Sequence, residues 1–424
     1  MHRLTHLILA DMRPALGVTE PGAIAFAVAT AGQYVSGSLL KIRLVLNSGL
    51  YKNAFTCGIP HSRELGNEYA AALGYVAANA NLGLECLKNV KGRDNRQAKE
   101  LVREGKVHVE LGEITSRIHI HAEVITDHDH ATVTINDAHT NITSIRVNGI
   151  DVFKHATAIS SGLTVSASPL IHQYTLRQLL NYASRIPLSE IAFISKAYDM
   201  NLKLFQQSLQ SNRTPFTHFL YKKNGEQVVS ADEQLTASLL CNGAIEARVL
   251  GLSRPAMSIT GSGAHGIIAT LPLYASQQVN GYSEEQLLRA TALSYLICMY
   301  IKEYSGKLSA FCGCAIAAGT GMACGLGFLK GGDLKALTLI IRNMASSITG
   351  MICDGGNHGC TMKGVVAVDA AYRSVDLALA GISIEARHGI NGQTPEDTMR
   401  NMGLIASPGM VETERVIVDI MKNK

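Results

Sequence analysis

Apolar and polar residues alternate with a period of two in one stretch of the chain and follow a helical period over most of the rest. From Lys106 to about Ser166 the period is two, and turn residues such as those at 127–130 separate the alternating runs. The runs cover residues 107–110, 118–121, 131–135 and 144–147. Because successive side chains of a strand point to opposite faces, this pattern predicts an antiparallel sheet with one solvated face.

Beyond residue 174 the pattern is helical almost to the end of the sequence. The expected helices are 175–184, 188–208, 232–250, 284–303, 309–328, 334–352, 361–380, 395–405 and 411–422. Several of them are apolar on all sides, so they are expected inside a helical domain and not on its surface. Residues 1–104 have a mixed pattern, with expected helices at 21–31, 65–83 and 95–104 and a strand at 41–46.

Together these patterns predict an α+β protein in which an antiparallel β subdomain is set into a mainly helical domain with buried central helices. The expected divisions are a mixed N-terminal region at 1–104 that packs on the helical body, the β subdomain at 105–170, and the helical domain at 171–424.

The composition predicts a folded chain with a core of small side chains. Hydrophobic residues make up 47% of the 424 residues and charged residues only 17%, which excludes a disordered chain. Aromatic residues are 5%, Trp is absent and Gly occurs 39 times, so close approach of backbones is expected. A net charge of +4, spread along the chain, is too small to indicate a nucleic-acid partner.

The first residues lack the apolar region and cleavage site of a signal peptide, so a cytoplasmic location is expected. Residues 308–329 carry no charge, and their length would span a bilayer. Because five of these residues are Gly and no basic or aromatic belt flanks both ends, we expect a buried central helix and no membrane partner.

Five of the nine cysteines lie between residues 312 and 360. Cys86, Cys241, Cys298 and Cys324 occur in apolar helical runs and are expected to be inert core residues.

The sharpest cluster is Cys312, Cys353 and Cys360. The glycines between Cys353 and Cys360 predict a loop that joins two helices, where a helix N-terminus would lower the pKa of a thiol. Cys314 would be about 200° from Cys312 around a helix, so at most one of the two is expected to face the site. Three thiolates suit an iron–sulfur cluster with one open iron, while zinc or inert thiols are the alternatives.

Two weaker motifs have less specific interpretations. The string 261–266 matches GxGxxG, but Pro272 is expected to stop a following helix within two turns, and no βαβ unit surrounds it. It is either a structural turn or a loop whose amides hold an anion. His119 and His121 share a strand face, near His128, His130 and His139, and this group is either a zinc site or ordinary surface.

These residues also carry a family resemblance. The matching stretches, in order, are 13–21, 52–53, 70–74, 79–85, 262–263, 266–267, 308–310 and 350–355, with Cys360 and Lys363. Through them the chain resembles, nearly end to end, the L-cysteine desulfidases and the uncharacterised bacterial proteins grouped with them. That family is distantly related to the iron–sulfur L-serine dehydratase α chain.

The resemblance implies a [4Fe-4S] lyase that splits L-cysteine, or a similar small L-amino acid, into pyruvate, ammonia and sulfide or water. It implies that Cys312 and Cys353 are cluster ligands. The third ligand of the family lies in a GCTEP motif, which reads Gly-Val-Thr-Glu-Pro here, so that Val18 takes its place. Cys360 is the expected replacement, with Cys57 or Cys314 as further candidates and loss of the cluster as the alternative.

Other residues near these motifs have expected roles, with an ordinary surface position as the alternative for the two candidate bases. Lys363 is a candidate base if burial lowers its pKa, and His358 is its rival. Lys52, Asn53, Ser262 and Gly263 are candidates for holding the substrate carboxylate, and Glu20 for holding the amino group or orienting a helix end. The rival functions are a cluster-free protein that binds a small carboxylate and a zinc hydrolase, and the resemblance is compatible with a homodimer.

Overall fold

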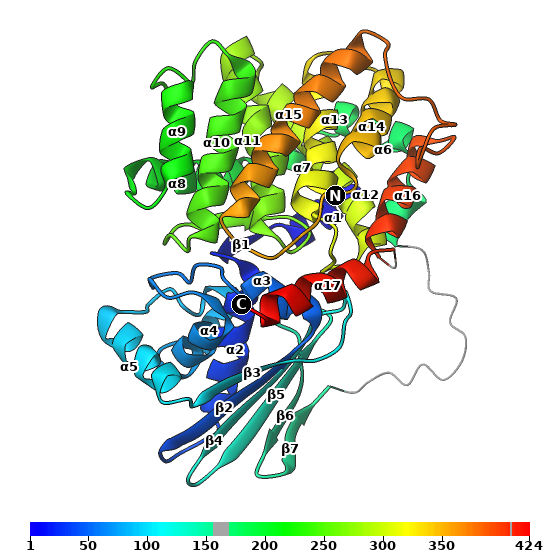
Figure 1. The fold of residues 1–424 in the computed structure, drawn as a ribbon. Helices are drawn as coiled ribbons and strands as arrows, with labels where there is room; N and C mark the ends of the chain where they lie inside the picture. The colour runs from blue at the N-terminus through cyan, green and yellow to red at the C-terminus, as the bar shows by residue number, and fades with distance from the viewer. Residues whose placement is uncertain (156–168, 408) are drawn as a thin grey trace, which may run out of the picture.

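The computed structural model describes residues 1–155, 169–407 and 409–424. Its chain forms a helical body and, beside it, a six-stranded sheet covered by helices, as Figure 1 shows. The predicted α+β class is confirmed.

The sheet has the strand order β3-β2-β4-β5-β6-β7. Its strands are β2 (Leu39–Leu46), β3 (Val107–Leu111), β4 (His119–Thr126), β5 (His130–Asn136), β6 (Ile142–Val147) and β7 (Ile150–Lys154). The expectation of a purely antiparallel sheet is wrong at one edge, because β3 pairs with β2 in parallel. A parallel pair needs a long crossover, and the chain between these strands supplies it as α3 (Ser48–Ala54), α4 (Gly66–Val76) and α5 (Gly92–Arg103). The expected division after residue 104 thus separates two paired strands.

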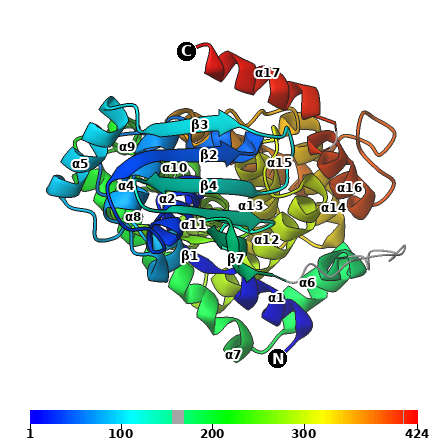
Figure 2. The ribbon, with the colours of Figure 1, turned by 90° about the horizontal axis from the view of Figure 1, so that it is seen from below.

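Helices cover one face of the sheet, as Figure 2 shows, and buried residues alternate with partly exposed ones along the strands. Helix α2 (Thr19–Gly32) contacts β4 and β5, and α4 contacts β3. Along β4, Ile120, Ala122 and Val124 are fully buried, while His119 and His121 are partly exposed. This is the predicted alternation of strand residues.

The helical body is built around α10 (Glu233–Val249), α11 (Gly263–Asn280), α12 (Glu284–Ser305) and α13 (Gly319–Leu329), which pack against one another. Around them lie α6 (Leu176–Arg185), α7 (Leu188–Ile191), α8 (Ser195–Gln210), α9 (Pro215–Lys223), α14 (Leu334–Ile348), α15 (Gly359–Leu379) and α16 (Pro395–Ala406). The uncharged segment 308–329 ends in α13, which is buried as expected. No helix within 1–155, 169–407 and 409–424 is long and apolar enough to cross a membrane.

Helix α11 corrects the expectation that Pro272 stops the chain, because the helix continues through this proline to Asn280. An interior proline removes one backbone hydrogen bond, but nearly the whole of α11 up to Ser276 is buried among neighbouring helices. Tertiary packing therefore outweighs the local cost.

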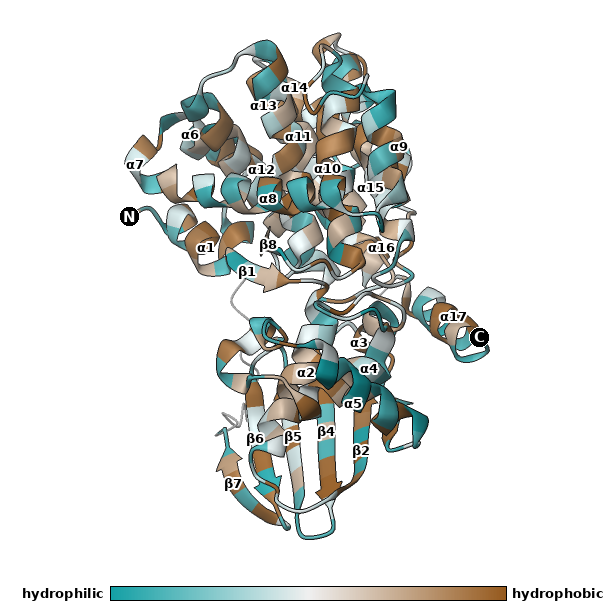
Figure 3. Ribbon diagram, turned by 90° about the vertical axis from the view of Figure 1, so that its left-hand side faces the viewer, coloured by the Kyte–Doolittle hydropathy of each residue, from teal (hydrophilic) through white to brown (hydrophobic). Residues whose placement is uncertain are grey.

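Both terminal regions connect the two parts of the fold. After α1 (Arg3–Asp11), strand β1 (Arg13–Leu16) pairs with β8 (Pro255–Ser258) of the helical body before the chain enters α2. At the other end, α17 (Val411–Lys422) returns across the body to pack on α3. Figure 3 shows β1 at the helical body and α17 between that body and the helices that cover the sheet.

Candidate functional site

A cavity of about 230 Å³ lies where the first turns of α2 and α11 meet. The turn between β5 and β6 and the loop that precedes α13 complete its wall. Of the residues singled out from the sequence, Glu20, Asn53, Ser262 and Cys353 line it. The other lining residues used below are Asp11, His139, Thr260, His265, Lys302, Gly313 and Cys314.

Glu20 is held as a carboxylate in this wall. Asn53 donates a hydrogen bond from Nδ2 to Glu20 Oε1 at 3.0 Å, and His139 Nε2 lies 3.8 Å from the same oxygen. Burial would raise the pKa of Glu20, but His139, Asn53 and Arg248 lower it to about 2. His139 Nε2 itself is buried and has no hydrogen-bond partner within the described residues.

The loop before α11 holds a histidine in the cavity wall. Thr260 has φ of +51°, which is strained for a β-branched residue and marks a candidate functional position. Asp11 accepts a hydrogen bond from the Thr260 backbone N–H, and the Thr260 hydroxyl bonds His265 Nδ1. Burial lowers the pKa of His265 well below its usual value, and the cations of Lys302 and Arg248 lower it further. His265 is therefore neutral near pH 7.

Lys302 is a buried lysine in the same wall. Its ammonium donates to the Lys307 carbonyl at 3.3 Å, and burial lowers its pKa. Both Lys302 and His265 lie against Gly313, where a Cβ atom would meet His265 Nε2 at 2.9 Å. A side chain at position 313 would therefore displace both groups.

A short backbone pairing brings Cys312 and Cys353 into one region. Phe311 and Ile352 form an antiparallel bridge, the Cys312 N–H donates to Met351 O at 3.0 Å, and the Cys353 N–H donates to Ala310 O at 2.6 Å. Cys312 lies just before the helix and Cys314 lies in a π-helical turn, Cys314–Ala318, so the 200° separation expected on a regular helix does not apply.

Burial makes the cysteines of this region weak acids, contrary to the expectation of lowered thiol pKa values. The Cys314 thiol and burial raise the pKa of Cys312, and burial raises that of Cys353. Burial and the neighbouring Cys353 raise the pKa of Cys360 to about 12. The charges of Cys312, Cys353 and Cys360 influence one another, so the three thiols share one region.

The loop between Cys353 and Cys360 joins α14 to α15, as predicted, and packs against the N-terminal region. Gly355 has φ of +102°, and a Cβ atom there would collide with the Lys52 carbonyl. A Cβ atom at Gly356 would lie 2.9 Å from Val18 Cγ1. Val18, which takes the place where the resemblance implies a third ligand, thus lies directly against the cysteine loop.

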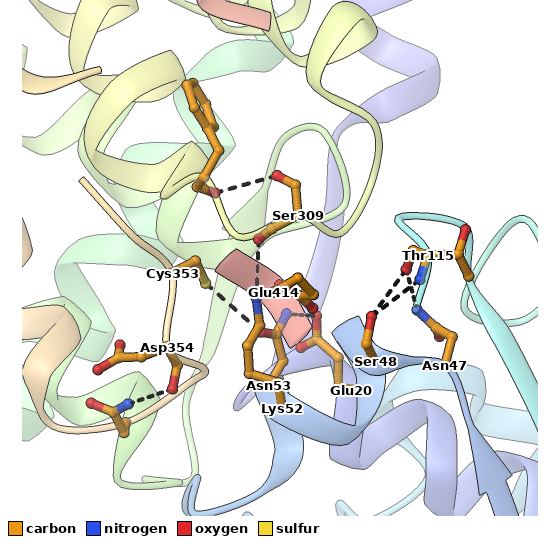
Figure 4. A network of polar contacts seen from close by, with 12 residues as sticks. Glu20, Asn47, Ser48, Lys52, Asn53, Thr115, Ser309, Cys353, Asp354 and Glu414 are labelled. Carbon is orange, nitrogen blue, oxygen red and sulfur yellow. Dashed lines mark hydrogen bonds and ion pairs between the residues drawn. The ribbon is translucent and has the colours of Figure 1, made fainter. Parts of the chain in front are cut away.

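Lys52 forms a buried ion pair next to the loop between Cys353 and Cys360. Its ammonium lies 2.6 Å from Glu414 Oε2 of α17 and donates to Ser309 O at 3.1 Å, and both side chains are buried. Figure 4 shows this pair beside Asn53, whose Oδ1 lies 3.8 Å from Cys353 Sγ. Lys52 therefore supports the cavity wall, and its charge is already neutralised.

The two residues expected as bases lie outside the cavity wall. Lys363 pairs with Asp354. Burial alone would lower the pKa of Lys363, but Asp354 and the cysteines reverse this and raise it, so the condition for a base role is not met. His358 Nε2 contacts Glu246 Oε1 at 2.6 Å, and Glu246 also accepts hydrogen bonds from the first turn of α9.

Ser262 and Gly263 form the start of α11. The Ser262 hydroxyl makes no hydrogen bond in the described parts of the chain, and Ser262 provides no side-chain cap for the helix. Gly263 packs against Arg248, whose Nε would lie 2.7 Å from a Cβ atom at this position.

The described residues hold no group of three or more His, Cys, Asp or Glu side chains that could bind a metal ion. His119 and His121 share a strand face as expected, but they bond Asn136, Thr134 and Glu123 of the sheet. Burial of Cys86, Cys241, Cys298 and Cys324 is confirmed.

Sequence reasoning missed His265, Lys302 and Arg248 as candidate functional residues. Lys302 ends a run of uncharged residues at 290–301, and Arg248 follows the mainly apolar stretch 235–245. A charged residue inside an otherwise apolar helix could have indicated them. Such a residue is seldom buried unless it has a partner, so it marks a place where a partner or ligand is needed.

Comparisons with known proteins agree with the resemblance seen in the motifs. The family model described as the serine dehydratase alpha chain matches residues 81–419. A UPF0597 protein of Clostridium botulinum is 39% identical over 422 residues, covering 99% of this chain and 98% of that relative. Further UPF0597 proteins are 35% identical over 424 residues in Caldanaerobacter subterraneus and 34% over 420 residues in Bacteroides fragilis. Each of these covers 99% of this chain and 97% or more of the relative.

Proposed function

The chain belongs to the serine dehydratase alpha-chain family, and on this premise we propose that it is a lyase acting on a small L-amino acid. The proposed reaction removes sulfide from L-cysteine, leaving pyruvate and ammonia, with elimination of water from L-serine as the related activity. The observation that carries this proposal is the cavity in which Glu20, His265 and Lys302 converge beside Cys353.

The size and charge of the cavity support a small zwitterionic substrate. Its volume of about 230 Å³ accommodates only a small molecule. The carboxylate of Glu20, with a pKa of about 2, can accept hydrogen bonds from a substrate ammonium group. The Ser262 hydroxyl and the amides that begin α11 can donate to a substrate carboxylate.

The cavity also holds groups that can take a proton from a substrate carbon. His265 is neutral, and the lowered pKa of Lys302 increases its neutral fraction. General-base catalysis needs such a group within hydrogen-bond reach of the proton that it removes. His265 and Lys302 therefore replace His358 and Lys363 as the proposed proton acceptors.

We further propose that Cys312, Cys353 and Cys360 hold a [4Fe-4S] cluster, in keeping with the general association of this family with iron and sulfide. These side chains do not form a ready-made metal-binding group in the described residues, so they would have to close around the cluster as it binds. Such a cluster supplies, when bound, a Lewis acid for the departing group on the β-carbon. The three thiols share one region, and the charges of Lys52 and Lys363 favour the thiolate form of Cys353 even though these lysines pair with Glu414 and Asp354.

Anaerobic reconstitution with iron and sulfide tests this function. The reconstituted protein is expected to bind both and to form pyruvate from L-cysteine or L-serine, while Cys353→Ser loses both properties. Cys324→Ser is the matched control, because Cys324 is buried in α13 away from the cavity wall. Reconstituted protein that forms no pyruvate from either substrate would overturn the proposal.

A cluster-free protein that binds a small carboxylate is the second candidate. Val18 at the usual ligand position favours it, as does the lack of a metal-binding side-chain group in the described ranges. Protein that takes up no iron anaerobically, yet is stabilised against heat by a small amino acid, would select this candidate.

A further inference from the structure

Arg248 is a buried cation that has no hydrogen-bond or ion-pair partner among the residues that the structure describes. It lies in the last turn of α10 and is 5% exposed. No hydrogen bond or ion pair links its guanidinium to another residue of the described ranges, and Nε is fully buried. By contrast, buried Lys52 is paired with Glu414. An unpaired buried charge is strongly destabilising, so a partner from outside the chain is the simplest compensation.

Arg248 packs beside the N-terminus of helix α11, which is also positively charged. Nε lies 2.7 Å from where a Cβ atom of Gly263 would be, and Gly263 is the first residue of the 18-residue helix α11. The N-terminus of a helix carries partial positive charge and free N–H groups. Two positive groups that lie side by side at close range repel, and an anion that contacts both relieves this repulsion.

The nearest carboxylate of the cavity is already engaged. Glu20 feels the charge of Arg248, but the two are not within ion-pair distance, and Glu20 instead contacts Asn53 and His139. Gly261 and Ser262, which immediately precede Gly263, line the cavity. A small anion in the cavity can therefore reach the start of α11, where Arg248 lies.

We propose that Arg248 and the first turn of α11 bind the α-carboxylate of a small L-amino acid. This rests on the proposed function for the identity of the anion. A carboxylate has two oxygens, so one can accept from the guanidinium and the other from the amides of the helix. Lys52, expected from the sequence to hold this carboxylate, has Glu414 instead.

Substitution of Arg248 in the full-length protein gives a readout that does not depend on turnover. Ligand-free Arg248→Met is expected to lower the melting temperature much less than the control does, because it removes a charge that no described residue pairs and loses only the longer-range effect of that charge on Glu20. The matched control is Arg342→Met. Arg342 Nε is also buried and unpartnered within the described residues, but its Nη2 donates to the Gly392 and Gln393 carbonyls. Its substitution is expected to lower the melting temperature.

Binding of L-serine and of L-serinamide, measured by calorimetry, tests the ligand chemistry. The wild type is expected to prefer L-serine by about tenfold or more, since hydrogen bonds to a charged group are worth this much. Arg248→Met is expected to lose the preference, Arg248→Lys to keep part of it, and Arg342→Met to retain it.

The inference is overturned if Arg248→Met keeps the preference, if the wild type shows none, or if Arg248→Met lowers the melting temperature as much as Arg342→Met does. Failure of the proposed function looks different. In that case no pyruvate forms from L-serine or L-cysteine, while the preference that depends on Arg248 remains.

Discussion

Glu20 keeps a negative charge in the interior because its neighbours are arranged to hold it. The side chain is 6% exposed, and burial alone would favour the protonated form. Asn53 donates to it, His139 lies 3.8 Å away and Arg248 contributes positive charge. The same neighbours line or adjoin the cavity, so Glu20 stays ionised only while these residues keep their places.

The lowered pKa of Glu20 predicts a specific loss of stability in acid. Its folded pKa of about 2 lies below the ordinary 4.5, so its stabilising contribution is complete above pH 4.5 and is lost as the pH falls toward 2. The difference in unfolding free energy between wild type and Glu20→Gln should shrink by about 2 kcal/mol between pH 6 and pH 3. Urea denaturation at both pH values measures it, and equal pH slopes for the two proteins would contradict it.

The sequence motifs identified only some of the residues that line the cavity. Glu20, Asn53, Ser262 and Cys353 were singled out from motifs, and they line it. The roles of Lys363 and Lys52 depended on ion pairs that the fold creates, with Asp354 nine residues before Lys363 in the cysteine loop and with Glu414 of α17. Such pairings decide whether a lysine is free, and no local pattern encodes them.

At the scale of helices, α12 and α13 pack so closely that backbone meets backbone. A Cβ atom at Gly321 of α13 would overlap the Ser294 carbonyl of α12. The Trp-free, glycine-rich composition predicted such close approach. This packing holds Lys302, near the end of α12, against the loop that precedes α13.

Gly321→Ala should therefore destabilise the protein by about 1–3 kcal/mol, the usual cost of overpacking a core. Gly350→Ala is the control, because nothing lies within 4 Å of a Cβ atom at that position. Urea midpoints measure both variants. A shift for Gly321→Ala no larger than that for Gly350→Ala would show that the two helices can separate freely.

Most helices and strands could be predicted from periodicity, and the exceptions share a cause. The parallel pairing of β2 with β3 and the continuation of α11 through Pro272 both depend on packing between distant segments. Periodicity reports which face of a segment is buried, but it does not report what covers that face. The short helix α3 is likewise fixed by its contact with α17.

For the whole molecule, the pair between Lys52 and Glu414 joins the first part of the chain to its last helix (Figure 4). Lys52 is 1% exposed and lies below the cysteine loop. Loss of one partner leaves the other as a buried, unpaired charge.

Lys52→Met and Glu414→Leu are each expected to destabilise the protein by about 3–5 kcal/mol, whereas the two substitutions combined should recover most of the loss. Arg103→Met, which breaks an exposed pair with Glu100, should cost less than about 1 kcal/mol. Guanidinium denaturation of the set gives the coupling energy, and additive effects of the two substitutions would contradict a direct pairing.

Lys52 and Glu414 are 362 positions apart, and this separation orders events during synthesis. A ribosome must translate almost the whole chain before the partner of Lys52 emerges from its exit tunnel. Until then the Lys52 ammonium has no partner, and its burial costs free energy, so α3 cannot take its final packing against α17 before Glu414 is present. The buried pair that supports the cavity wall is thus completed only after translation has passed Glu414.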